Sequence, residues 1–92
     1  MRTTFDDRLW SEGTIGIPTP AGEDKKITVC KYWVKHYDEP SVYGIDEGRI
    51  SKLEIRIDGE TTCAYDRGWV IEPDENDPAT ELALAILMHE YN

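Results

Sequence analysis

Apolar and polar side chains alternate strictly from Lys52 to Asp58, within a segment over residues 50–58 that has the clearest pattern in the chain. Leu53, Ile55 and Ile57 fall on one face of an extended segment, and the charged residues between them fall on the other. This period of two predicts a β-strand with one buried face. The Asp58-Gly59 pair at its end is typical of a tight hairpin turn.

A partner strand is predicted to return from that turn and to run over residues 61–71. Cys63, Tyr65 and Trp69 share one face of this segment, and Ile71 continues it. Gly68 allows a bulge or the close approach of another segment. The two strands form the most regular hairpin that the sequence predicts.

Two earlier strands are less regular. Residues 10–17 are interrupted by glycine and predict a short, weak strand, after which Pro18, Pro20 and Gly22 break the chain. Residues 27–37 are rich in β-branched and aromatic side chains, which favour a strand. The alternation fails around Lys31, which indicates either a bulge there or a strand covered on both faces.

A C-terminal helix is predicted from the Asp77-Pro78 pair onward, because Asp suits an N-cap and Pro suits the first helical position. Strong helix formers follow as far as Tyr91. Apolar side chains occupy nearly the whole circumference, which is more than one sheet face covers. Either strands wrap this helix or it also faces a second molecule, in which case residues 79–91 form a homodimer.

Together these segments predict a single domain of the α+β class over residues 1–92. An antiparallel sheet of about four strands carries one C-terminal helix packed across a face. Residues 1–9 are expected to form a loose arm, residues 10–71 the sheet region and residues 77–91 the helix. A chain of 92 residues has room for one small core.

Charge narrows the range of partners. The chain carries 19 Asp and Glu against 10 Lys and Arg, a formal net charge of −9. Such a field repels phosphate backbones and anionic lipids, so direct binding to nucleic acid or to a membrane is not expected. A basic protein, including one whose own ligand is a nucleic acid, remains open as a partner.

Location and redox state follow from what the sequence lacks. No signal peptide is apparent and no apolar run approaches the length of a membrane span, so a cytoplasmic location is expected. Cys30 and Cys63 lie in separate predicted strands. A disulfide between them is geometrically possible, but two free, half-buried thiols fit a chain without an export signal better.

Candidate chemistry is sparse. His36 stands near Asp38 and Glu39, which suggests a metal site or a general base, but the spacing fits no ligand motif. We therefore expect His36 to face solvent at a strand end and His89 to lie on the polar stripe of the helix. The glycines and acids after residue 37 lack the order of a calcium loop or a phosphate cradle. The sequence predicts no catalytic residue, no metal site and no cofactor.

The long connection over residues 37–48 is the strongest candidate for recognition, because ordered loops of this length usually bind rather than pack. A second candidate is the Arg67-Gly68-Trp69 segment. Arg67 is either an internal brace for the loop or an aromatic/Arg anchor of an interface. The predicted partner-binding residues are Asp38, Glu39, Tyr43, Asp46, Glu47, Arg67 and Trp69.

The acidic residues of the loop, and those between Glu72 and Asp77, also suggest mimicry of nucleic-acid phosphates toward a basic groove. The alternative is a soluble acidic surface without a partner.

Three sequence motifs are similar to those of a known family. They are Trp10-x-Glu12-Gly13-x-Ile15, then Tyr37-Asp38-Glu39-Pro40-Ser41-x-Tyr43-Gly44-Ile45-x-x-Gly48-Arg49-Ile50-Ser51-Lys52-Leu53, and finally Tyr65-Asp66-Arg67-Gly68-Trp69. Over residues 10–90 the chain resembles a small uncharacterised domain encoded by anaerobic Gram-positive bacteria, their phages and other mobile elements. The segment around Pro18 to Lys26 is longer than in that pattern.

The resemblance implies a mobile-element accessory protein and supplies no activity. Small acidic proteins of such elements often bind and block a host protein, so it implies an inhibitor of the anti-CRISPR type. The alternative is a homo-oligomeric structural domain without an inhibitory role.

Overall fold

The computed structural model describes residues 10–21 and 24–92, and the arm expected at residues 1–9 lies outside this part of the chain. The described residues form a sheet of five strands, one short 3-10 helix and one α-helix. The elements are β1 (Trp10–Ala21), β2 (Asp24–His36), η2 (Ile45–Glu47), β3 (Ile50–Ile57), β4 (Glu60–Asp66), β5 (Trp69–Ile71) and α1 (Pro78–Tyr91).

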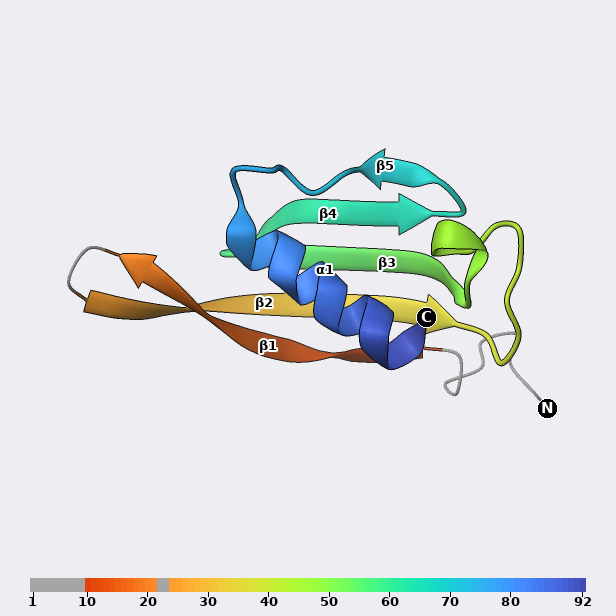
Figure 1. Cartoon of the computed structure of the whole chain (residues 1–92), viewed down its shortest axis with the longest axis horizontal. Helices are drawn as coiled ribbons and strands as arrows, with labels where there is room; N and C mark the ends of the chain where they lie inside the picture. The colour runs from red at the N-terminus through yellow and green to blue at the C-terminus, as the bar shows by residue number, and fades with distance from the viewer. Residues whose placement is uncertain (1–9, 22–23) are drawn as a thin grey trace.

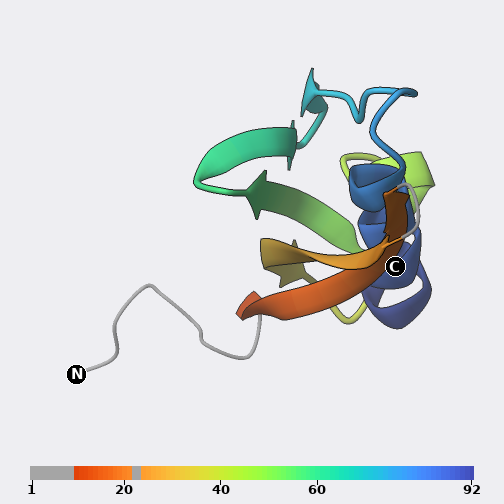
Figure 2. The ribbon, with the colours of Figure 1, turned by 90° about the vertical axis from the view of Figure 1, so that its left-hand side faces the viewer.

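Each strand pairs antiparallel with the next in sequence, so the sheet is a meander in the order β1-β2-β3-β4-β5. α1 runs diagonally across one face of this sheet, and the opposite face has no helix over it among the described residues (Figures 1 and 2). The expected α+β fold, an antiparallel sheet with a C-terminal helix across one face, is confirmed.

The core lies between α1 and the sheet. Alternate residues of β2, β3 and β4 point toward the helix, as the period of two in the sequence requires. Ile45 reaches the same core from the loop after β2. The buried apolar residues are Ile17, Cys30, Val34, Ile45, Ile50, Leu53, Ile55, Cys63, Tyr65, Ala79, Ala83 and Leu87.

The prediction that prolines end the first strand is wrong. β1 continues through Pro18 and Pro20 as far as Ala21 and pairs with β2 over its whole length. β1 is an edge strand, hydrogen-bonded on one side only, so a residue without an N–H can occupy positions that face outward. The bulge expected near Lys31 lies instead where the β2–β3 register shifts, between Lys35 and His36.

The single strand predicted over residues 61–71 is also wrong, because the chain reverses at Arg67 and Gly68. β4 ends at Asp66, and β5 folds back so that Trp69 pairs with Tyr65. Trp69 and Ile71 are therefore exposed on the short edge strand, whereas Tyr65 is buried. The hairpin turn predicted at Asp58-Gly59 is present, with φ of 53° and 80° at its two residues.

The helix begins as predicted. Asp77 is the N-cap and accepts a hydrogen bond from the backbone N–H of Thr80 at 3.2 Å, and Pro78 is the first helical residue. The buried face includes Ala83 and Leu87. Leu82 and Ile86 lie on the outer side and are exposed, so the sheet covers only part of this apolar helix.

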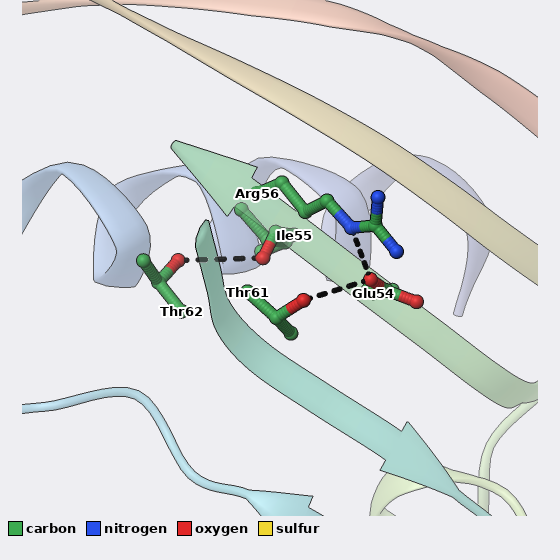
Figure 3. A network of polar contacts seen from close by, with 5 residues as sticks. All are labelled: Glu54, Ile55, Arg56, Thr61 and Thr62. Carbon is green, nitrogen blue, oxygen red and sulfur yellow. Dashed lines mark hydrogen bonds and ion pairs between the residues drawn. The ribbon is translucent and has the colours of Figure 1, made fainter. Parts of the chain in front are cut away.

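The open face of the sheet combines aromatic rings with charged side chains. Lys31 and Arg56 both lie over the ring of Trp33, at 5.9 and 5.1 Å from its centroid. Arg56 Nε and the Thr61 hydroxyl donate to one oxygen of Glu54 where the β3–β4 register shifts (Figure 3). The charge of Arg56 is thus compensated by a carboxylate on its own strand.

Candidate binding surface

The loop between β2 and β3 is fixed by hydrogen bonds from several directions. The backbone N–H of Tyr37 donates to Arg49 O and that of Ser41 donates to Gly48 O, both at 3.0 Å, which closes the loop at its base. The Tyr65 hydroxyl donates to Tyr43 O at 2.9 Å and links the loop to β4. These bonds hold the loop in one conformation on the end of the sheet.

The side chain of Asn92 provides a further anchor from beyond the end of α1. Its Oδ1 accepts a hydrogen bond from the Ile50 N–H at 2.9 Å, and its Nδ2 donates to Ile45 O at 3.0 Å. The side chain of Ile45 is 2% exposed and seals the loop against the core. The loop is therefore tied to both layers of the domain.

Although its backbone is fixed, the loop displays apolar and aromatic side chains. Val42 is 73% exposed and Tyr43 59% exposed. Trp69, on the neighbouring β5, is 41% exposed and packs edge-on against Tyr65, with ring centroids 5.1 Å apart. We call the surface formed by residues 37–48 and 67–69 the loop end of the molecule.

Backbone strain is concentrated at the loop end. Among the described residues, four non-glycine residues have positive φ, and three of them are predicted binding residues: Asp46 at 51°, Glu47 at 58° and Arg67 at 57°. The fourth, Asp58, belongs to the hairpin turn. Left-handed non-glycine residues cost on the order of 1–3 kcal/mol each and cluster at binding sites. Backbone hydrogen bonds hold these conformations, from the Glu47 N–H to Gly44 O in the loop and from the Arg67 N–H to Ser51 O at the β4–β5 turn.

A pocket of about 520 Å³ lies at the loop end, where β2, β3 and the β4–β5 turn meet the loop. Aromatic and hydroxyl groups from the loop and strands line it together with basic side chains. Its lining comprises Lys35, Tyr37, Ser41, Tyr43, Ser51, Lys52 and Arg67. This volume is in the range of small-molecule binding sites.

Two of the three cations of this pocket share one carboxylate, and the third, Lys35, lies over the rings of Trp10 and Tyr37 with its Nζ 5.9 and 5.5 Å from their centroids. Lys35 and Lys52 are directly paired across β2 and β3, an arrangement of like charges that destabilises a sheet. Asp66 Oδ1 lies 3.8 Å from Lys52 Nζ and 3.8 Å from Arg67 Nε, so one carboxylate serves two cations. The three basic side chains and Asp66 leave a local formal charge of +2.

The structure brings together some predicted binding residues and separates others. Tyr43 and Arg67 line the same pocket, and Asp38, Glu39, Asp46 and Glu47 are exposed on the adjoining loop. Arg67 forms its ion pair with Asp66 on its own turn, and no pair with a loop carboxylate occurs among the described residues. The side chain of Arg67 is 68% exposed, which leaves it available to a ligand.

The second acidic segment lies elsewhere. The linker from Glu72 to Asp77 runs back to the start of α1, at the end of the sheet opposite the loop (Figure 1). The two acidic clusters therefore do not form one continuous surface.

The histidines are placed differently from each other. The prediction that His36 faces solvent is wrong, because this side chain is half-buried. Its Nε2 lies 3.0 Å from the Ser11 hydroxyl oxygen, and its ring stacks on that of Tyr91 with the centroids 4.7 Å apart. Burial, reinforced by the positive charge of Arg49, lowers the pKa of His36 against a smaller opposing effect of Asp38. His89 is exposed on the helix.

Both cysteines are free and fully buried beneath the helix. Burial raises the pKa of Cys63 to about 12, and burial together with the charge of Asp77 raises that of Cys30. Thiols in this state are poor nucleophiles and poor metal ligands. Within residues 10–21 and 24–92, no group of His, Cys, Asp and Glu side chains could hold a metal ion.

Lys35, Lys52, Ser41 and Asn92 were not among the predicted site residues. The two lysines occupy polar positions of separate strands, and the sequence does not give the register that pairs them. The Tyr43 carbonyl is bonded to Tyr65, and the Asn92 side chain is bonded to Ile45 and Ile50. These contacts join segments far apart in sequence, which no local pattern encodes.

Fold and surface define a small α+β domain with a fixed loop and a cationic pocket at one end of a meander sheet. The chain matches the family described as Domain of unknown function (DUF7678) over residues 9–92, and it belongs to that family. No curated protein and no solved structure matches it. The described residues contain no helix that is long and apolar enough to cross a membrane.

Proposed function

We propose that this protein is a small non-enzymatic binding protein that docks on a protein partner through its loop end. The observation that carries the proposal is the combination of a fixed, strained loop with outward apolar side chains. Val42 and Tyr43 are more than half exposed while the backbone between them and the core is held by hydrogen bonds. A surface ordered before binding loses less conformational entropy when the partner docks.

The chemistry of the loop end indicates the nature of the partner. Tyr, Trp and Arg are the residue types that dominate binding energy at interfaces, and Tyr43, Trp69 and Arg67 stand at its centre. The same loop carries exposed carboxylates at Asp38, Glu39, Asp46 and Glu47, which favour a basic partner surface. Our proposal therefore includes a basic, nucleic-acid-binding host protein as the partner, with the loop carboxylates occupying positions of phosphates.

Such a protein would act as an inhibitor in the manner of an anti-CRISPR protein, as an accessory product of a phage or mobile element acting in the cytoplasm. Because the Glu72–Asp77 segment lies at the opposite end, the proposed mimicry involves the loop carboxylates alone.

The test compares two sets of charge-neutralising variants. The immobilised protein is exposed to a nuclease-treated lysate of its bacterial host, the retained protein is identified, and its affinity is measured with purified components. The loop variant carries Asp38→Asn, Glu39→Gln, Asp46→Asn and Glu47→Gln. The control variant removes the same number of charges at the far end, with Glu60→Gln, Glu72→Gln, Asp74→Asn and Glu75→Gln.

We expect the loop variant to lose the complex and the control variant to retain it, with binding that weakens as salt rises. Release of the partner by added DNA or RNA would support competition for a nucleic-acid groove. Equal affinity of both variants and the unmodified chain would contradict docking through the loop end.

A second candidate function is a homo-oligomeric structural domain, favoured by one observation. Leu82 and Ile86 are one helical turn apart on the outer side of α1, and both are exposed. A homodimer through residues 79–91 would cover them. Light scattering at high protein concentration distinguishes the candidates, since this one requires a dimer that Leu82→Glu converts to a monomer.

A further inference from the structure

The pocket at the loop end has a charge opposite in sign to that of the whole chain. The protein carries a formal net charge of −9, yet Lys35, Lys52 and Arg67 gather around one hollow, and Asp66 pairs with Lys52 and Arg67. At physiological ionic strength the field of a charge is screened over about 8 Å. A small ligand seated among these three basic side chains meets a formal charge of +2 from them and Asp66, and the exposed carboxylates of the loop lie beside the pocket.

A stability argument does not account for this arrangement. Lys35 lies directly opposite Lys52 in the β2–β3 register, and like charges in that position weaken strand pairing. Arg67 adds a third cation at a backbone position with φ of 57°. On the same open face, by contrast, Arg56 is compensated by Glu54. Three cations around a hollow, two of which share a single carboxylate, match an anionic ligand, as clusters of basic side chains generally do.

We propose that this pocket binds a nucleoside phosphate. A phosphate monoester carries a charge of about −1.5 to −2 at pH 7, which matches the local excess of +2. Lys35, Lys52 and Arg67 hold the phosphate group. The Ser41 oxygen already accepts the Tyr43 N–H at 3.0 Å, so the Ser41 hydroxyl proton is available to donate to a phosphate oxygen.

Tyr43 provides the surface for the base. Its ring is more than half exposed, and its backbone carbonyl is fixed by the Tyr65 hydroxyl. The ring of Tyr37 is less suited to this role because Lys35 Nζ lies over it, 5.5 Å from its centroid. A base that stacks on Tyr43 gains the energy that aromatic side chains give single bases, while its phosphate reaches the lysines.

A mononucleotide fits these observations better than a polymer. A nucleic-acid strand would pass from the pocket over the exposed acids of the loop, which repel its backbone. The inference goes beyond the proposed function: it shares Tyr43 and Arg67 with the loop end, but it does not depend on a protein partner.

The test is isothermal titration calorimetry on the isolated chain with AMP, adenosine and inorganic phosphate as separate probes. We expect AMP to bind at least tenfold more tightly than adenosine or phosphate. Lys52→Gln is expected to lower the affinity for AMP at least tenfold. Tyr43→Leu is expected to lower the affinity for AMP toward the affinity for phosphate. Arg56→Gln, which removes a compensated cation on the same face, is expected to change AMP affinity less than twofold.

Three results would overturn the inference. These are no binding of AMP at millimolar concentration, equal losses in Lys52→Gln and Arg56→Gln, and binding of a single-stranded oligonucleotide without binding of AMP. Circular dichroism of each variant verifies its fold. Because no partner is present, failure here leaves the docking proposal standing, and failure of the lysate experiment leaves this one standing.

Discussion

Gly44→Ala is the substitution that most directly tests whether the loop is locked against the end of the sheet. A Cβ atom at residue 44 would lie 2.0 Å from Gly48 O and 2.7 Å from Gly48 C. Both atoms belong to the backbone, so no side-chain rotation relieves the clash. The dihedral angles of Gly44, φ −78° and ψ 158°, suit any residue, and the effect is therefore one of space alone.

The magnitude follows from what the loop must release. Separating residues 44 and 48 weakens the hydrogen bonds from Glu47 N–H to Gly44 O and from Ser41 N–H to Gly48 O. Each is worth about 0.5–1.5 kcal/mol. Ile45, now 2% exposed, would lose part of a burial worth about 1.5–3 kcal/mol. We expect Gly44→Ala to lower the free energy of unfolding by about 2–4 kcal/mol.

Urea denaturation followed by tryptophan fluorescence measures this difference. The matched control is Gly68→Ala, because a Cβ there would meet no atom within 4 Å and the φ of Gly68 is not in the left-handed region. Gly68→Ala should lower the free energy of unfolding by less than about 0.5 kcal/mol. It could instead raise it by up to about 1 kcal/mol, because alanine restricts the unfolded chain. If Gly44→Ala is as stable as Gly68→Ala, the reasoning about the locked loop is refuted.

Three other predictions can be checked by simple measurements. Asn92→Ala removes both hydrogen bonds of its side chain and should cost about 2 kcal/mol in the same urea assay; an unchanged midpoint would show that the anchor is dispensable. Because the pKa of His36 is lowered in the folded state, the unfolded chain takes up its proton at higher pH, so stability should fall as pH drops below about 6.5. His36→Gln should flatten that fall, and an identical pH profile would contradict it. The thiols of Cys30 and Cys63 should react with Ellman's reagent only after unfolding, and rapid labelling of the native protein would contradict their burial.

Local patterns in the sequence predicted the elements whose geometry is itself local. The alternation of Leu53, Ile55 and Ile57 identifies β3, and Asp58-Gly59 identifies its turn. The Asp77 N-cap marks the start of α1. Each of these signals lies within a few residues of the structure it determines.

The incorrect strand predictions concern segments in which the place of a residue in the sheet outweighs its local conformational preference. Pro18 and Pro20 suggest a break in any sequence, but an edge strand accommodates them. The reversal at Arg67 depends on a non-glycine residue with positive φ, held by a hydrogen bond from its N–H to Ser51 O.

The candidate site likewise combines residues that a local pattern indicates with residues that only the folded sheet brings together. Loop residues such as Tyr43 were predicted because the loop is long and patterned, and the structure places Tyr43 on the lining of the pocket. Lys35 and Lys52 face each other only because of the β2–β3 register, and that register shifts at a bulge between Lys35 and His36. No local sequence pattern gives this pairing.

The order of the strands has a consequence for how the protein emerges from the ribosome. Each strand of the meander pairs with the one synthesised just before it, so the sheet can grow as the chain is made. The helix that covers its core comes afterwards, and Asn92, which holds Ile45 and Ile50, comes later still. The sheet can therefore form before the loop is anchored, and a ribosome-bound fragment without α1 and Asn92 would lack both the anchored loop and the binding surface that we propose there.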